Sequence, residues 1–543
     1  MPTHHLPEPQ PAHAGSAPAG KPSPAGHVGS RCAGKVVGRV ISCFIATVLA
    51  GCALAPGAPP ARPIGTPQAY GIANRLSWGA SRSVVAEAEA EGADGYLARQ
   101  LKPGPTVLPP AVQLQIDAMT ISQRPFEDLV REMDQRNKDS NTAASEDERK
   151  AARQAYQQAM TGLAREAATR HLLRAVYSPN QVQEQMTWFW LNHFNVHQAK
   201  ANLRAMVGDY EETAIRPHAL GRFRDLLGAV AHHPAMLRYL DNAQNAVGRI
   251  NENYARELLE LHTLGVNGGY TQQDVQEMAR VLTGNGIADL KAMPGLRKEQ
   301  QADYMRKGLY EFNPNRHDYG PKQLLGQPIR QHGAAELDEA LDRLARHPAT
   351  ARFISEKLVR YWLSDDPMPG LVARMAQAFT RSDGDIAVTL RTLMASPEFA
   401  QGAGRKFKDP VRFVVSAVRL AYDDRPILNV GPMLGWLNRM GEPLYGRATP
   451  DGYPLDAASW SSPGQMATRF EIARTIGVGN AGLFKADGAQ PPERPALPKL
   501  ANALYSRAID ATLAAPTRQA LAQAATPQEW NSFLLSSPEF MHR

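Results

Sequence analysis

Cysteine is almost absent from this chain of 543 residues. The three that occur are Cys32, Cys43 and Cys52, and all of them lie before residue 53. The rest of the chain therefore has no thiol for a disulfide or for a cysteine metal site.

Several patterns that mark common functions are also missing. The formal net charge is +7, but no concentrated basic face is visible, and nucleic-acid-binding proteins usually show one. We therefore expect no nucleic acid partner. The sequence contains no glycine-rich phosphate loop, no G-x-S-x-G elbow and no zinc-protease helix. No motif thus assigns a reaction.

Long apolar runs are scarce as well, and the clearest one is Val40–Ala50. Eleven residues are too few to span a bilayer comfortably and are typical of the apolar part of a signal peptide. Three basic side chains precede the run: Arg31, Lys35 and Arg39. It ends in Leu49-Ala50-Gly51-Cys52, which resembles a bacterial lipobox with Cys52 as the lipidated residue.

The segments around this leader define the expected location. We interpret residues 1–51 as a disordered extension followed by a lipoprotein signal peptide, and residues 52–69 as a proline-rich tether. The residue after Cys52 is Ala53 and not aspartate, which favours an outer-membrane anchor. The sequence thus predicts a cell-envelope protein on the periplasmic side, held to the membrane by a lipid.

Residues 70–543 show helical periodicity almost throughout, because apolar residues recur at spacings of three and four. We predict an all-α body, with a possible division into two packed helical subdomains near residue 330. Gly284–Arg330 is irregular and could hold a short hairpin, and Leu444–Ser462 is a long aromatic loop. The charged segment Asp134–Lys150 is interpreted as a solvated loop or a frayed helix.

One short motif occurs twice. LMASPEF at Leu393–Phe399 returns as LLSSPEF at Leu534–Phe540. In each copy the proline cannot continue the preceding helix, and the phenylalanine is free to enter the core. We interpret the motif as a structural device that stops a helix and docks its end.

The stretch NENYARELLELHTLGVNGGY (Asn251–Tyr270) has three asparagines, three glutamates, an arginine and a histidine in one predicted helix and its exit turn. On a helical wheel Arg256, Glu257 and Glu260 lie on a polar stripe, and Arg256 could pair with Glu260. His262 lies on the opposite face among leucines. Gly265 is expected to end this helix, and Thr271 to begin the next one with Asp274 three residues later.

Two more polar groups complete the candidate site. Asn192 and His193 follow the aromatic run WFWL, and His317-Asp318 lies in the irregular segment. In one interpretation His193, His262 and His317-Asp318 converge, with Glu257 or Asn192 nearby. This group could bind a divalent metal or act as a general base. The alternative is that the histidines are core residues bonded to backbone carbonyls or carboxylates.

The same residues carry a resemblance to the bacterial family known as domain of unknown function 1800. The resemblance covers nearly all of the body, and its most specific segment is NENYARELLELHTLG. Other matching segments are Asn74–Gly79, Phe189–Phe194, Ala279–Gly284, His317–Lys322, His347–Thr350 and both SPEF motifs. The chain departs from the family at Asn285, where tryptophan is usual, and at His197, where a small residue is usual. We therefore leave His197 out of the candidate site.

The resemblance implies an exported protein, with an exported sulfatase-like protein as a partner, and no reaction. Two functions stay open. One is a lipid-anchored accessory or binding protein for an exported partner. The other is an envelope hydrolase or other enzyme that uses His193, His262 and Glu257, with Asn192, Arg256, Glu260, His317 and Asp318 in binding roles.

Overall fold

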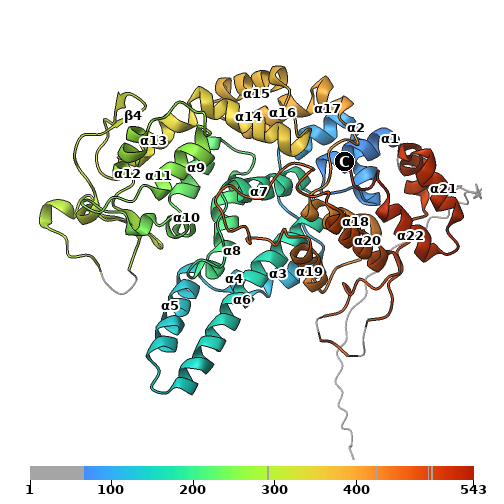
Figure 1. Cartoon of the computed structure of the whole chain (residues 1–543), viewed down its shortest axis with the longest axis horizontal. Coiled ribbons are helices and arrows are strands. Elements are labelled where there is room, and N and C mark those ends of the chain that lie inside the picture. The colour runs from blue at the N-terminus through green and yellow to red at the C-terminus, as the bar shows by residue number, and fades with distance from the viewer. Residues whose placement is uncertain (1–65, 290–292, 424, 487, 491–492) are drawn as a thin grey trace, which may run out of the picture. The chain divides into compact units, whose positions relative to one another are not determined.

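The computed structural model describes residues 66–289, 293–423, 425–486, 488–490 and 493–543 (Figure 1). Helices dominate this part of the chain and its strands are short, which confirms the all-α prediction. None of its helices is both long enough and apolar enough to cross a membrane. The predicted leader, Cys52 and the tether up to residue 65 lie outside the described residues, and the division near residue 330 stays a prediction.

The body begins with α1 (Pro67–Leu76), slightly earlier than residue 70. The Thr66 hydroxyl accepts a hydrogen bond from the Ala69 amide, and Pro67 occupies the first turn, so these residues start a helix inside the predicted tether. The helices that follow are α2 (Arg82–Gln100), α3 (Pro110–Asp117), α4 (Thr120–Gln123), α5 (Phe126–Thr142), α6 (Glu146–Tyr177) and α7 (Gln181–His193).

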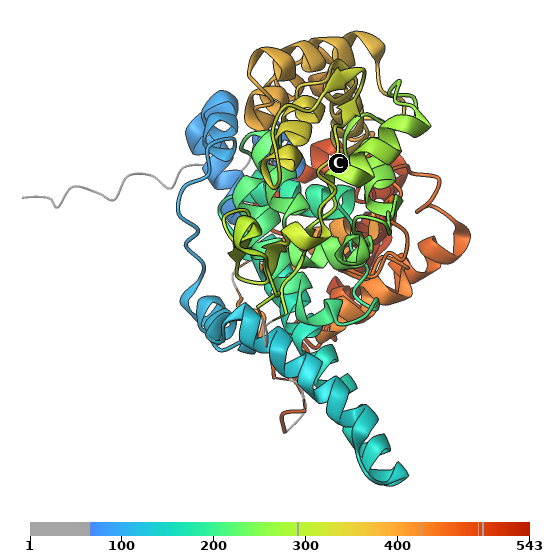
Figure 2. The ribbon, with the colours of Figure 1, turned by 90° about the vertical axis from the view of Figure 1, so that its left-hand side faces the viewer.

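Asp134–Lys150, interpreted from its charge as a solvated loop or a frayed helix, belongs for the most part to two long helices, so the loop alternative is wrong. α5 and α6 lie side by side, and residues 143–145 alone connect them (Figures 1 and 2). Ser145 and Glu148 form a capping box that begins α6. The charged side chains are therefore the solvated faces of a helical hairpin.

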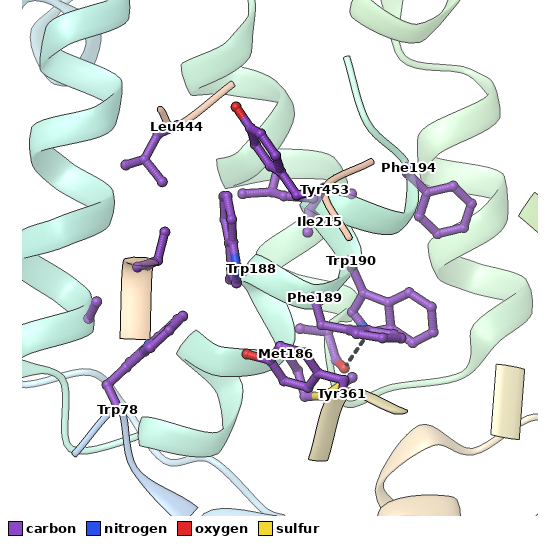
Figure 3. Close-up of a cluster of buried hydrophobic side chains, with 14 of the residues drawn as sticks. Trp78, Met186, Trp188, Phe189, Trp190, Phe194, Ile215, Tyr361, Leu444 and Tyr453 are labelled. Carbon is purple, nitrogen blue, oxygen red and sulfur yellow. Dashed lines mark hydrogen bonds between the residues drawn. The ribbon is translucent and has the colours of Figure 1, made fainter. Parts of the chain in front are cut away.

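α7 runs through the core, and nearly all of its side chains are buried. Its aromatic residues point to both sides (Figure 3). Trp188 stacks near Tyr453 with ring centroids 6.3 Å apart, and Phe189 packs against Tyr361 on the other side. The indole N–H of Trp190 donates to the carbonyl of Ala219 at 3.0 Å. α7 also buries polar side chains, among them Gln185, Asn192 and His193, so these need partners within the core.

The next segment consists of short helices, two of which have π-helical hydrogen bonding. They are η1 (Leu203–Ala205), α8 (Val207–Asp209), the π-helix η2 (Tyr210–Ile215), η3 (Arg216–His218), α9 (Phe223–Ala231), α10 (Pro234–Tyr239), η4 (Asn242–Gln244), α11 (Asn253–Glu257), the π-helix η5 (Leu258–Thr263) and α12 (Gln272–Val281). The predicted exit at Gly265 is confirmed by its positive φ of 81°, and Thr271 forms the expected capping box with Asp274.

The irregular segment contains the predicted hairpin. Strands β2 (Met305–Lys307) and β3 (Tyr310–Phe312) pair antiparallel, and β1 (Asn285–Ile287) pairs with the other edge of β3 in the register Asn285↔Phe312. A second pair is formed by β4 (Gln323–Leu324) and β5 (Gln327–Pro328). The 3-10 helices η6 (Lys298–Gln300) and η7 (Pro314–Arg316) lie between the strands.

The remaining helices follow one another to the C-terminus, and α14 packs on α15 and α20 on α22 (Figure 1). They are α13 (Ala335–Ala345), α14 (Pro348–Trp362), α15 (Pro369–Arg381), α16 (Ile386–Met394), α17 (Pro397–Gln401), α18 (Pro410–Tyr422), α19 (Gly431–Arg439), α20 (Pro463–Gly477), η8 (Tyr505–Ile509), η9 (Asp510–Thr512), α21 (Ala515–Gln523) and α22 (Pro527–Ser536).

Both SPEF motifs stop a helix and dock its end, as predicted. α16 and α22 end just before them, and in each copy the serine hydroxyl accepts a hydrogen bond from the phenylalanine amide at 3.1 Å. Phe399 and Phe540 are both buried. The guanidinium of Arg75 lies 3.4 Å from the Phe399 ring centre, a cation–π contact. Nζ of Lys408 lies 3.8 Å from the ring centre of Phe540.

Candidate functional site

His193 and His262 are neighbours in the core. His193 is the last residue of α7, and His262 belongs to the π-helix η5. Their ring centroids are 6.1 Å apart, and Nε2 of His193 lies 3.1 Å from the carbonyl oxygen of His262. The expected contact between these two histidines is thus present, and a π-helical turn, which is frequent at functional sites, carries one of them.

The hydrogen bonds of His193 define its protonation state. A carbonyl only accepts, so Nε2 carries the proton and donates to His262. Nδ1 lies 2.9 Å from Nζ of Lys357 on α14, and an ammonium only donates, so Nδ1 accepts. Burial and the neighbouring Lys357 ammonium hold the pKa of His193 well below its usual value. His193 is therefore a neutral imidazole that links α7, η5 and α14.

His262 is fully buried, with 0 % of its surface exposed. Neither of its ring nitrogens has a hydrogen-bond partner among the described protein groups, and the rings of Phe194 and Tyr254 pack against it. Burial, with a smaller effect of Lys357, lowers its pKa to about 3. His262 is therefore uncharged at neutral pH.

His317 and Asp318 do not join this pair, so the predicted convergence is wrong. Nδ1 of His317 lies 2.8 Å from the carbonyl oxygen of Thr283, and Nε2 lies 3.1 Å from a carboxylate oxygen of Glu336 on α13. Asp318 accepts two hydrogen bonds from Arg280 on α12, and these bonds lower its pKa to about 2 despite partial burial. The turn after α12 thus holds a separate polar cluster.

The polar stripe of α11 and η5 also differs from the expectation. Arg256 pairs with Glu252 at 3.1 Å and with Gln272 at 3.0 Å, and Glu260 accepts a hydrogen bond from the Tyr270 hydroxyl. The predicted Arg256–Glu260 pair is wrong because the π-helix begins at Leu258, and its wider turn changes the spacing that an α-helix would give. Partial burial raises the pKa of Glu257, and the carboxylates of Glu260 and Asp451 add to this shift.

Asn192 holds backbone of the long loop that follows α19. Its Nδ2 donates to the carbonyl of Tyr453 at 2.9 Å, and its Oδ1 accepts from the Tyr453 amide at 2.6 Å. Gly452 has a φ of 79°, and a Cβ atom there would collide with the carbonyl oxygen of Asn192. We call residues 444–456 the cleft loop; its backbone is fastened to the end of α7.

Other side chains fasten the cleft loop in the same way. Asn195 donates to the carbonyls of Arg447 and Thr449, and the Tyr239 hydroxyl donates to that of Ala448 at 2.8 Å. The backbone N–H of Gln198 donates to the carbonyl of Tyr445 at 2.9 Å, and its side-chain Nε2 donates to that of Leu444 at 3.1 Å. Loops held by a rigid scaffold often carry function.

A buried carboxylate that the sequence analysis missed also contacts this loop. Glu211 on η2 accepts from the Tyr445 hydroxyl and lies 3.0 Å from Nδ1 of His171 on α6. Burial raises its pKa, but His171 and Tyr445 together lower it to about 2. Tyr445 itself has a φ of 56°, which is unusual outside glycine.

A cleft opens beside these groups, between α7, α14 and the cleft loop, with a volume of about 320 Å³. Its lining includes Asn192, Lys357, Asp451 and Tyr453. Lys357 was missed, although its spacing to Ile354 and Tyr361 places a lysine on the apolar face of α14. The contact with His193 therefore connects the buried histidine pair to a cleft.

A larger cleft of about 880 Å³ lies between α9, α10 and the three-stranded sheet. Three histidines that we had not considered line it: His218, His232 and His233. His233 lies 3.0 Å from a carboxylate oxygen of Asp209. In the described residues no three His, Cys, Asp or Glu side chains are grouped as metal ligands, here or at the histidine pair.

Fold and site together define a helical protein with a buried histidine pair beside a polar cleft. The sequence profile of the family described as protein of unknown function (DUF1800) matches residues 71–542. The chain therefore belongs to this family. No curated protein and no solved structure matches the chain.

Proposed function

We propose that this chain is a lipid-anchored protein of the cell envelope whose helical body binds an exported partner. The binding role is supported by the hydrogen bonds of the cleft loop. Side chains of α7 and of neighbouring segments donate to its backbone carbonyls and hold it beside the cleft. Asn192, one of the predicted site residues, is committed to this task. Such a preformed loop lowers the ordering cost of binding.

The proposed anchor is Cys52, on the periplasmic side of the outer membrane. Its support is the sequence Leu49-Ala50-Gly51-Cys52 after an apolar run, with Ala53 next. The test is fractionation of cells that express wild type or Cys52→Ala, with Cys32→Ala as the matched control. We expect Cys52→Ala alone to leave the membrane fraction, and an unchanged distribution would refute the anchor.

The proposed partner is an exported sulfatase-like protein, as family resemblance suggests. The test is co-purification of the two full chains after co-expression, with Gly452→Ala to disturb the cleft loop. Gly248→Ala is a matched control, because Gly248 has a similar φ of 74° but open space around its Cβ position. We expect Gly452→Ala to lose the partner and Gly248→Ala to retain it. Equal recovery with both variants would refute a role of the loop.

The second candidate is an envelope hydrolase or other enzyme that uses His193, His262 and Glu257. It is favoured by the position of Lys357, which lines the cleft and donates a hydrogen bond to the buried His193. The test compares metal content and melting temperature of wild type, His193→Ala and His262→Ala. The enzyme is favoured if wild type contains a bound metal that both variants lack, and if the variants have the melting temperature of wild type. Lower melting temperatures without bound metal would favour core histidines.

A further inference from the structure

Lys357 differs from the other charged groups that line the cleft. Arg447 pairs with Asp451 at 3.0 Å, and Arg360 pairs with Glu356 at 2.9 Å. Asp365 binds Lys406, and Asp456 accepts hydrogen bonds from Ser459. In the described part of the chain no carboxylate lies within 4.0 Å of the Lys357 ammonium.

The ammonium of Lys357 also has hydrogen-bonding capacity to spare. It carries three N–H donors, and the one described hydrogen bond leads to Nδ1 of His193. The ring of Phe353 lies 5.5 Å from Nζ. A desolvated cation without a counter-ion costs free energy, and an anion that enters the cleft would recover part of that cost.

The rest of the cleft suits the body of a small ligand. Phe353, Tyr453, Pro454 and Leu455 offer apolar surface. The volume of about 320 Å³ is at the lower end of the range of ligand pockets, about 300–1,000 Å³. The carboxylate of Asp451 acts on the charge of Lys357 from beyond 4.0 Å, and Arg447 and Thr449 hold it by hydrogen bonds.

We infer that this cleft binds a small ligand through an anionic oxygen group, a carboxylate or a phosphate, with Lys357 as the direct contact. The ligand's apolar part lies against Tyr453 and Phe353. The inference rests on the proposed binding function and deepens it at the same cleft. His193 positions the ammonium by accepting a hydrogen bond from one of its N–H groups, and Asp451 weakens anion binding at the site by its negative charge.

The test is calorimetric titration of the purified full chain with benzoate, phenyl phosphate and inorganic phosphate, and with benzamide as the neutral control. We expect saturable binding of benzoate or phenyl phosphate and none of benzamide. Lys357→Met should weaken the binding of the anion at least about tenfold, because one charge-assisted hydrogen bond is lost. Asp451→Asn should bind the anion as tightly as wild type or more tightly.

Two further readouts separate binding from folding. Lys357→Arg keeps the charge and should retain binding, while circular dichroism verifies that each variant is folded. Among the described residues, the titratable groups that interact electrostatically with Lys357 are His193 from α7, His262 from η5, Arg360 from α14 and Asp451 from the cleft loop. Because burial lowers the pKa of Lys357 to about 8, binding at pH 8 should take up protons in wild type and not in Lys357→Arg.

The inference is overturned if none of the anions binds, if benzamide binds equally well, or if folded Lys357→Met binds the anion with wild-type affinity. These outcomes are separate from the partner experiment. Anion binding without co-purification of the sulfatase-like protein would refute the partner alone. Co-purification without anion binding would refute this inference alone.

Discussion

The buried His262 should make the protein sensitive to mild acid. In the unfolded chain a histidine has a pKa near 6.5, whereas in the folded protein burial and Lys357 lower the pKa of His262 to about 3. Below pH 6.5 the unfolded state takes up a proton that the folded state does not. Stability is therefore complete above pH 6.5 and is lost as the pH falls toward 3. Between pH 7 and pH 5 the loss from this residue amounts to about 2 kcal/mol.

The perturbation that tests this reasoning is His262→Leu, a change of similar volume that removes the titrating ring. The assay is the urea-unfolding midpoint at pH 7, 6 and 5. We expect wild type to lose stability over this range and His262→Leu to lose about 2 kcal/mol less. The remaining acid sensitivity should include His193, whose pKa is also lowered by burial.

The matched control is His332→Gln, because His332 is exposed. It should show the same pH dependence as wild type. A His262→Leu protein that loses as much stability between pH 7 and pH 5 as wild type would refute the reasoning. So would a histidine ring signal of His262 that titrates above pH 5 in the folded protein.

Three further predictions follow from the packing. Asn192→Ala removes both hydrogen bonds to Tyr453 and should lower the local stability of the cleft loop by about 2 kcal/mol. Hydrogen exchange of the Tyr453 amide should then be about 30-fold faster, and an unchanged exchange rate would show that Asn192 does not hold the loop. Lys408→Met should not lower the melting temperature, since burial and then Arg412 hold the pKa of Lys408 well below normal; a clear fall would show that the ammonium is stabilising. Phe540→Ala should cost about 3–5 kcal/mol in urea unfolding, and Phe540→Leu much less; equal losses would contradict a packed docking site.

Local signals predicted the elements well where they act over a few residues. Thr271 with Asp274 begins a helix as expected, because a capping box satisfies amides within one turn. The same signal, Ser145 with Glu148, lies inside Asp134–Lys150, where the charge indicated a solvated loop or a frayed helix. Two antiparallel helices tolerate that charge because they expose it on their solvated faces.

The candidate site was only partly predictable. Helical spacing placed His262 on an apolar face, and its contact with His193 followed the expectation. The spacing of an α-helix failed for Arg256 and Glu260, because a π-helix interrupts the turn between them. Nothing local distinguished His317 from the other two histidines, and its place was decided by Glu336 on α13.

The sequence by itself determined the helical class, the likeness to its family, the two SPEF stops and the polar nature of Asn251–Tyr270, because each depends on periodicity or on neighbours along the chain. Only the tertiary structure decided that Asn192 clamps Tyr453, that Lys357 joins His193 to a cleft, and that His317 lies in another cluster. These contacts join residues more than a hundred positions apart, or helices whose relative placement depends on packing of the whole core. Short-range spacing carries no information about such distances.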